Sequence, residues 1–284
     1  MIKKLLTITL SLMMIFTSFV PVFAEGEEVN IVGQYGIVID KDTGQVLYNK
    51  NAHDKMYPAS ITKILTCIVA IEMLDDLDKT ATITQSDIDT VWETGATSAD
   101  FTVGEVVTYR DMLMGAMLPS GADACRALAN NTCGSQEKFV EKMNQLVNKL
   151  GLKDSHFVNT TGIHDDDHYT TAYDLYLIFN ECLKYDLFKD AIHQAHYTAV
   201  FTRNGQEVQQ TYDSTNYYLL GNKTPPEGVS IIGGKTGTTD NAGLCLILYV
   251  EDGSGNGYIS VLLGCPDKDT LYSSMSKLLS DISK

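Results

Sequence analysis

The protein has 284 residues, of which 44% are hydrophobic and 20% are charged, and this ordinary globular composition excludes a disordered or fibrous chain. Its formal net charge is -15, with 36 acidic residues against 21 lysines and arginines. Because phosphate binding needs clustered basic side chains, this balance argues against nucleic acid or an anionic membrane surface as a partner.

The N-terminal segment is typical of a secretory signal peptide. Lys3 and Lys4 precede an apolar run over residues 5–20, and the segment ends in Val22-Phe23-Ala24, which suits signal peptidase. We therefore predict a signal peptide over residues 1–24, with an uncleaved anchor as the alternative. Cleavage near Ala24 would leave residues 25–284 as a secreted, extracytoplasmic, single-domain protein without a stable membrane anchor.

Paired strands and a buried helix open the mature chain. Residues 35–40 and 45–48 have strand patterns, and Lys41-Asp42-Thr43-Gly44 between them predicts a hairpin turn. Apolar residues then recur with helical spacing over residues 58–77, and a proline stands in the first turn of this predicted helix. Further helices are predicted over residues 111–117, 122–130, 136–150 and 172–183.

The last third of the chain is rich in strands. Residues 229–232, 244–250 and 258–264 have strand patterns, and the turn-forming segment 251–257 makes the last two antiparallel. An apolar stripe over residues 271–282 predicts a terminal helix that packs on the sheet. The predicted fold class is α/β (α+β): an antiparallel sheet from both termini, flanked by helices, with a mostly helical subdomain inserted between them.

The cysteines show none of the C-x-x-C pairs that structural zinc or redox sites use. Most lie in apolar stretches, so we interpret them as small buried hydrophobic residues. Cys245 and Cys265 lie on successive predicted strands, and a disulfide between them stays open. The six are Cys67, Cys125, Cys133, Cys182, Cys245 and Cys265.

Ser60 and Lys63 form the first candidate site. They are three residues apart, so they share one face of the predicted helix. A serine hydroxyl needs a neighbouring base to become a nucleophile, and burial on this apolar helix would lower the pKa of Lys63 toward that role. Taken alone, S-x-x-K is weak evidence, because an N-capping serine beside an exposed lysine gives the same pattern.

Two further segments carry hydroxyl and ammonium groups. Leu118-Pro119-Ser120-Gly121 places a second serine in a turn before a helix. Gly233-Gly234-Lys235-Thr236-Gly237-Thr238 lies on a strand or at its end, where the glycines allow a ligand to approach the backbone and the lysine and hydroxyls can receive a carboxylate. The spacing of a phosphate-binding loop is absent.

S-x-x-K, a serine turn and K-T-G in this order form the signature set of penicillin-recognising serine enzymes. Across nearly all of the mature sequence, the chain resembles the D-alanyl-D-alanine carboxypeptidases, the low-molecular-weight penicillin-binding proteins. Segment 157–165 and the stretch from His168 to Asp174 also look like that family's segments. The E-x-x-L-N motif of class A β-lactamases is absent from the sequence.

The resemblance implies a serine β-lactamase/DD-peptidase-like fold with the active site between the sheet and the helical subdomain. It implies Ser60 as the acylated nucleophile, Lys63 as its base and Ser120 in proton relay. Gly237 belongs to the segment that would bind substrate, in which Lys235, Thr236 and Thr238 would hold the terminal carboxylate. The backbone N–H groups of Ser60 and Thr238 would form the oxyanion hole.

The sequence departs from the family pattern at two points. Ala122 stands where the second motif usually has asparagine, and its methyl group cannot hydrogen-bond a substrate. We therefore expect slower acylation or a shifted substrate preference. The chain is also too short for the C-terminal β-rich domain and amphipathic anchor that many relatives carry.

The expected activity is removal of the terminal D-alanine from peptidoglycan stem peptides that end in D-Ala-D-Ala, with β-lactams as covalent inhibitors. A β-lactamase-like hydrolase and a non-catalytic binder of penicillin or muropeptides are the alternatives. We expect a monomer without a cofactor. A metal site at His164, His168 and the aspartates between them is disfavoured, because the segment lacks helical context and tetrahedral spacing.

Overall fold

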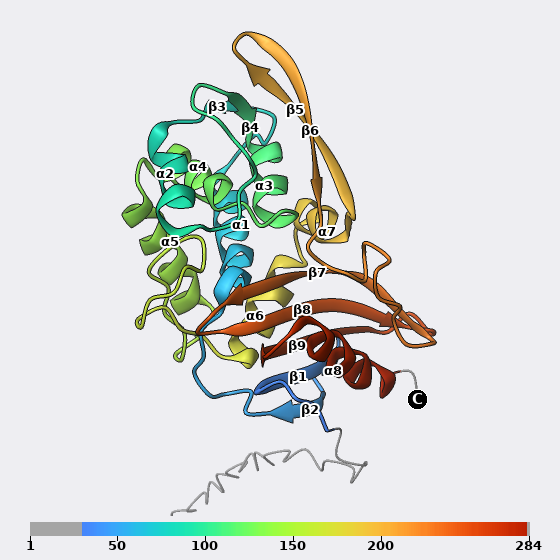
Figure 1. Ribbon diagram of the computed structural model, residues 1–284. Helices are drawn as coiled ribbons and strands as arrows, with labels where there is room; N and C mark the ends of the chain where they lie inside the picture. The colour runs from blue at the N-terminus through green and yellow to red at the C-terminus, as the bar shows by residue number, and fades with distance from the viewer. Residues whose placement is uncertain (1–29, 283–284) are drawn as a thin grey trace, which may run out of the picture.

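The structure is a computed structural model that describes residues 30–282. The predicted signal peptide over residues 1–24 lies outside these residues. Figure 1 shows a large sheet with helix α8 on one side, and a group of helices beyond helix α1 on the other. Within residues 30–282, no helix is both long and apolar enough to cross a membrane.

The large sheet combines strands from both ends of the chain, as predicted. It has five antiparallel strands in the order β2-β1-β9-β8-β7. Strand β1 pairs with β9, so that Tyr35 lies opposite Leu263. The strands are β1 (Tyr35–Asp40), β2 (Val46–Lys50), β7 (Val229–Thr239), β8 (Gly243–Asp252) and β9 (Gly257–Cys265).

Both faces of this sheet are buried. Alternate residues of a strand point to opposite faces, and in β8 Ile247 belongs to the core beneath the helices whereas Leu246 and Leu248 belong to the core beneath α8 (Lys268–Ser280). Helix α6 (Ala172–Cys182) packs against β9 and β1, and α7 (Asp186–His193) packs against β7. The sheet is therefore the middle layer of the molecule, and β7 forms one of its edges.

A helix forms within the predicted range 58–77, but it begins later and ends earlier than predicted. The chain first makes a 3-10 turn, η1 (Ala59–Ile61), and then enters α1 (Thr62–Met73). The helix stops four residues early, and the residues that follow it include Asp75 and Asp76. Aspartate is a poor helix former, and its charge is unfavourable at a helix C-terminus, which accounts for the early end.

The inserted region contains more elements than predicted. The four predicted helices form, as α3 (Tyr109–Met117), α4 (Ala122–Cys133), α5 (Gln136–Lys149) and α6. Helices α2 (Gln85–Thr94) and α7 and a second sheet were not predicted. This sheet has the order β3-β4-β5-β6, and its last two strands form the protruding hairpin in Figure 1. They are β3 (Thr80–Thr82), β4 (Val106–Thr108), β5 (His196–Arg203) and β6 (Gln206–Asp213).

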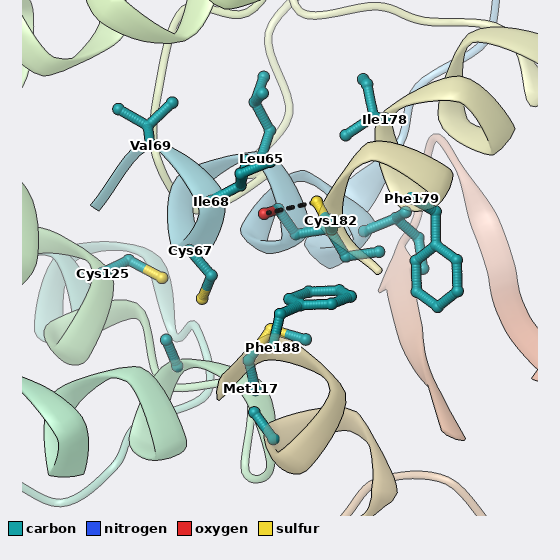
Figure 2. Packing of buried hydrophobic residues seen from close by; sticks show 14 of the residues in the cluster. Leu65, Cys67, Ile68, Val69, Met117, Cys125, Ile178, Phe179, Cys182 and Phe188 are labelled. Atoms are coloured by element: carbon teal, nitrogen blue, oxygen red, sulfur yellow. Dashed lines mark hydrogen bonds between the residues drawn. The ribbon is translucent and has the colours of Figure 1, made fainter. Parts of the chain in front are cut away.

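Helix α1 runs through the centre of the larger core, and three of the cysteines pack there (Figure 2). Cys67 of α1, Cys125 of α4 and Cys182 of α6 are fully buried and unpaired, and the Cys182 thiol contacts the Ile64 carbonyl oxygen at 3.9 Å. All six cysteines are free. The structure therefore confirms their interpretation as hydrophobic side chains, except that Cys133 is only half-buried.

Candidate active site

A cavity of about 530 Å³ lies between β7 and the helical region. The first turn of the α1 segment, the turn before α4, the loop after Asn159 and the outer edge of β7 form its walls. Six of the seven predicted site residues line it: Ser60, Lys63, Ser120, Thr236, Gly237 and Thr238. The three sequence motifs thus meet in one cavity.

Ser60 and Lys63 are in direct contact. Ser60 lies in η1 and Lys63 is the second residue of α1, and the lysine Nζ lies 2.8 Å from the serine Oγ. Ala59, just before the serine, has a φ of 47°, which is unusual for a residue with a side chain. Such strained backbone is often found at functional sites, where the surrounding structure holds it in place.

The Lys63 ammonium is placed where its charge is costly. The side chain is fully buried, and Nζ also donates to the Thr161 carbonyl oxygen at 2.8 Å. Desolvation lowers the pKa of Lys63 below its usual 10.5, although the field of Asp123 opposes part of this shift. An amine that loses its proton here keeps an N–H for Thr161 and presents its lone pair to the Ser60 hydroxyl.

Ser120 lies in a strained turn, and its hydroxyl makes no hydrogen bond to the described residues. Its φ is 65°, and the Thr97 hydroxyl donates to its carbonyl oxygen at 2.6 Å. The Oγ atom is buried and has no hydrogen-bond partner among the described residues. Since a buried hydroxyl without a partner is unfavourable, this geometry leaves Ser120 ready to bond a ligand in the cavity.

Strand β7 approaches Ser60 very closely at Gly237. A Cβ atom on this glycine would lie 3.1 Å from the backbone nitrogens of Ser60 and Ile61 and from the Pro58 carbonyl oxygen. Because β7 is an edge strand, one side of its backbone has no partner strand and can pair with a ligand. The glycine therefore allows a peptide on β7 to lie beside the Ser60 hydroxyl.

Lys235 does not line the cavity with the other six. Its side chain is 1% exposed, and its Nζ donates to the Thr236 carbonyl oxygen at 3.1 Å. Desolvation first, and then the nearby charge of Lys63, lower the pKa of Lys235 to about 7. The structure thus places two amines with lowered pKa values in one buried region.

The lowered pKa of Lys235 predicts a pH-dependent stability. The unfolded chain keeps the lysine proton up to its ordinary pKa near 10.5, whereas the folded chain releases it near 7. Above pH 7 the unfolded state therefore binds more protons, and stability rises with pH. We expect Lys235→Met to remove a slope of about 1 kcal/mol per pH unit between pH 7 and 8.5, measured by urea unfolding. Exposed Lys153→Met is the control, and equal slopes in all three proteins would contradict this assignment.

His168 anchors the loop that carries Thr161. The ring is buried, its Nδ1 accepts the Val158 N–H at 3.2 Å, and its Nε2 lies 2.8 Å from the Thr62 hydroxyl. Desolvation lowers the pKa of His168 to about 4, so the ring is neutral at pH 7. His164 instead lines the cavity, so the two histidines occupy different environments.

Several residues of the site were not identified from the sequence. Thr215, from the loop before β7, lines the cavity, and its hydroxyl lies 2.5 Å from that of Thr236. Thr97 supports Ser120 from the segment after α2, and Asp123 fixes the same segment through the Ser98 hydroxyl. Thr97 and Thr215 have no periodic signal, because they lie in loops that only the tertiary fold brings together.

Ala122 is fully buried as the first residue of α4, and its side chain does not line the cavity. Its backbone N–H donates to the Thr97 carbonyl oxygen at 2.8 Å. The neighbouring Asp123 accepts from the backbone nitrogens of Ala99 and Phe101. The Asp123 carboxylate is thus bonded to the segment after α2, and it does not replace an asparagine at position 122.

Residues 23–267 match the model of a protein family described as D-alanyl-D-alanine carboxypeptidase. A D-alanyl-D-alanine carboxypeptidase of Bacillus subtilis, DacF, is 31% identical over 287 residues, which cover 98% of this chain and 70% of the relative. One from Streptomyces sp. strain K15 is 32% identical over 253 residues, which cover 86% of this chain and 84% of the relative.

Solved structures show the same fold. A mutant of the Streptomyces K15 DD-transpeptidase superposes with a TM-score of 0.82 at 32% identity, over 88% of this chain and 96% of that one. Penicillin binding protein 5 from Haemophilus influenzae gives a TM-score of 0.76 at 26% identity, over 88% of this chain and 70% of the other. The predicted fold class is therefore confirmed.

Proposed function

The chain belongs to the D-alanyl-D-alanine carboxypeptidase family and is a serine peptidase, and we propose that Ser60 is its nucleophile. The proposed reaction is removal of the terminal D-alanine from peptidoglycan stem peptides. The observation that carries this assignment is the 2.8 Å contact between the Ser60 hydroxyl and the buried Lys63 amine. β-Lactams, which present a reactive amide to the same serine, are the corresponding covalent inhibitors.

Acylation begins when the neutral Lys63 amine takes the Ser60 proton and Oγ attacks the carbonyl carbon of the penultimate D-alanine. The negative charge that develops on the carbonyl oxygen faces the backbone N–H groups of Ser60 and Thr238. Preorganised donors of this kind lower the barrier because they need not reorient during the reaction. Gly237 allows the required closeness of β7 to the nucleophile.

The intermediate collapses when the peptide C–N bond breaks and the leaving D-alanine nitrogen receives a proton through Ser120. The unpartnered Ser120 hydroxyl supports this role. Thr236 and Thr238 hold the terminal carboxylate from the cavity wall, and the buried Lys235 beside them supplies positive charge in its protonated form. Water then attacks the ester on Ser60, takes the place of the lost amine and releases the shortened peptide.

An intact-mass time course of the mature chain with benzylpenicillin tests this proposal. We expect a lasting adduct of one penicillin per chain that peptide mapping assigns to Ser60. A transient adduct with consumption of penicillin would instead indicate the β-lactamase-like alternative. Absence of any adduct would overturn the nucleophile assignment and favour a non-catalytic binding protein.

We further propose that residues 1–24 direct export and that residues 25–284 act outside the cytoplasm as one monomeric catalytic domain. Two observations support the export. The substrate class of the family is part of the cell wall, and the match to the family model begins at residue 23, close to the predicted cleavage after Ala24.

A further inference from the structure

One wall of the active-site cavity is the loop of residues 159–163, and a second cavity lies behind it. This outer cavity has a volume of about 480 Å³, and residues of α4, of α5 and of the segment before the loop also line it. Thr161 and Ile163 line both cavities, whereas Asn159 of the loop and Asn144 of α5 line only the outer one. Because the loop has open space on two sides, side-chain hydrogen bonds must hold its shape where packing does not.

Two side chains of α1 bond to this loop from inside the molecule. Lys63 Nζ donates to the Thr161 carbonyl oxygen at 2.8 Å. Thr66, three residues further along the same face of the helix, donates its hydroxyl to the Thr160 carbonyl oxygen at 2.7 Å. All four of these residues are buried. Two successive carbonyl groups of the loop thus face α1, and one of them binds the amine that contacts Ser60.

The Asn159 side chain holds the backbone of the loop around itself. Its Oδ1 accepts the backbone N–H groups of Thr161 at 3.1 Å and of Gly162 at 2.7 Å, and the Thr161 hydroxyl at 3.2 Å. Its Nδ2 donates to the Ile163 carbonyl oxygen at 2.9 Å. The Gly162 N–H and the Thr161 carbonyl belong to one planar peptide group. Asn159 therefore binds the N–H of the same peptide group whose oxygen binds Lys63.

Helix α5 fixes the chain just before the loop through Asn144. Its Oδ1 accepts the Phe157 N–H at 3.0 Å, and its Nδ2 donates to the Phe157 carbonyl oxygen at 2.7 Å. These are the two bonds that a residue of a neighbouring β-strand would exchange with Phe157. Gln136, at the start of α5, accepts the Thr160 hydroxyl at 2.9 Å. The loop is therefore tied to α5 on the side of the outer cavity.

We propose that Asn159 and Asn144 are positioning residues, which act from outside the active-site cavity and direct the amine of Lys63. They do so by holding the Thr161 carbonyl oxygen in place. This role depends on the proposed function, in which Lys63 is the base for Ser60. An amine that donates one N–H to Thr161 keeps its lone pair directed at the Ser60 hydroxyl. When the carbonyl group moves, the amine turns with it and loses this alignment.

The rate at which benzylpenicillin acylates each variant, followed by intact mass, tests this role. We expect Asn159→Ala to lower the rate by about tenfold or more, because a displacement of about 1 Å at reacting groups can cost about a hundredfold. Asn159→Asp keeps the oxygen that accepts the two loop N–H groups, and it should recover most of this loss. Asn144→Ala acts one step further from the amine and should lower the rate by about threefold. Asn148→Ala, at an exposed position of the same helix, is the control and should acylate at the wild-type rate.

A double-mutant cycle with Lys63→Met separates positioning from general damage to the fold. If Asn159 acts through the amine, adding Asn159→Ala to Lys63→Met should change the remaining acylation rate by less than about twofold. An equal factor of loss in both backgrounds, or a wild-type rate in Asn159→Ala, would overturn the positioning role alone. Should Asn159→Ala fail to fold, the same cycle with Asn144→Ala decides between these results. Absence of any adduct on the wild-type protein would overturn the proposed function, and the positioning role with it.

Discussion

Lys63→Met is expected to abolish acylation of Ser60 while leaving the protein folded. The substitution removes the only base in contact with the Ser60 hydroxyl among the described residues, and general base catalysis contributes about a hundredfold to ten-thousandfold. We therefore expect the rate of penicillin adduct formation to fall by about a thousandfold or more. Methionine fills the buried volume without a charge, so relief of desolvation offsets the lost bond to Thr161.

The matched measurements separate chemistry from folding. The thermal midpoint of Lys63→Met should stay close to the wild type, and exposed Lys184→Met should acylate normally. The wild-type acylation rate should rise with pH, because only the neutral amine can accept the serine proton. Burial lowers the pKa of Lys63, so the midpoint of this rise should lie below pH 10.5. Acylation of Lys63→Met within tenfold of the wild type would show that another group acts as the base.

Gly162→Ala is expected to disrupt the turn that carries Ser60. Gly162 has a φ of 84°, and a Cβ atom there would lie 1.8 Å from the Ala59 carbonyl oxygen and 2.9 Å from the Ser60 nitrogen. Neither contact is with a flexible side-chain end, so the backbone itself must move. We expect a loss of about 3 kcal/mol or more in the free energy of unfolding, together with a large fall in acylation rate.

Gly151→Ala is the matched control for this substitution. Gly151 has a similar φ of 76°, but nothing lies within 4 Å of the Cβ position. The control therefore introduces the left-handed strain of about 1 kcal/mol without the clash, and it should acylate normally. If both variants lose the same stability and both acylate at the wild-type rate, Gly162 does not hold the turn that carries Ser60.

Elements with a strong local pattern could be predicted from the sequence. The strands of the large sheet, its hairpin turn and the terminal helix combine apolar periodicity with turn residues, and tertiary contacts reinforce these preferences. The hairpin of β5 and β6 was missed, although Asn204-Gly205 between them has φ values of 52° and 75°, as a tight two-residue turn requires. Its strands carry many exposed polar residues, which weakened the apolar alternation that identified the others.

The sequence motifs identified the chemical groups of the site but not their arrangement. The contact of Ser60 with Lys63 follows from helical spacing, and the structure agrees. The full burial of Lys235 does not follow from any motif, because it depends on how β7 packs against the helices. The support that Thr215 gives to Thr236 is likewise a product of packing between distant segments.

The pairing of β1 with β9 also has a kinetic consequence. Contacts between the two ends of a chain raise its contact order, and proteins dominated by such contacts fold slowly. A nascent chain that ends before β7 contains both Ser60 and Lys63, yet it lacks the wall against which a peptide must lie. We expect such a chain to be inert toward penicillin, so the enzyme gains its activity only when its last strands have joined the first.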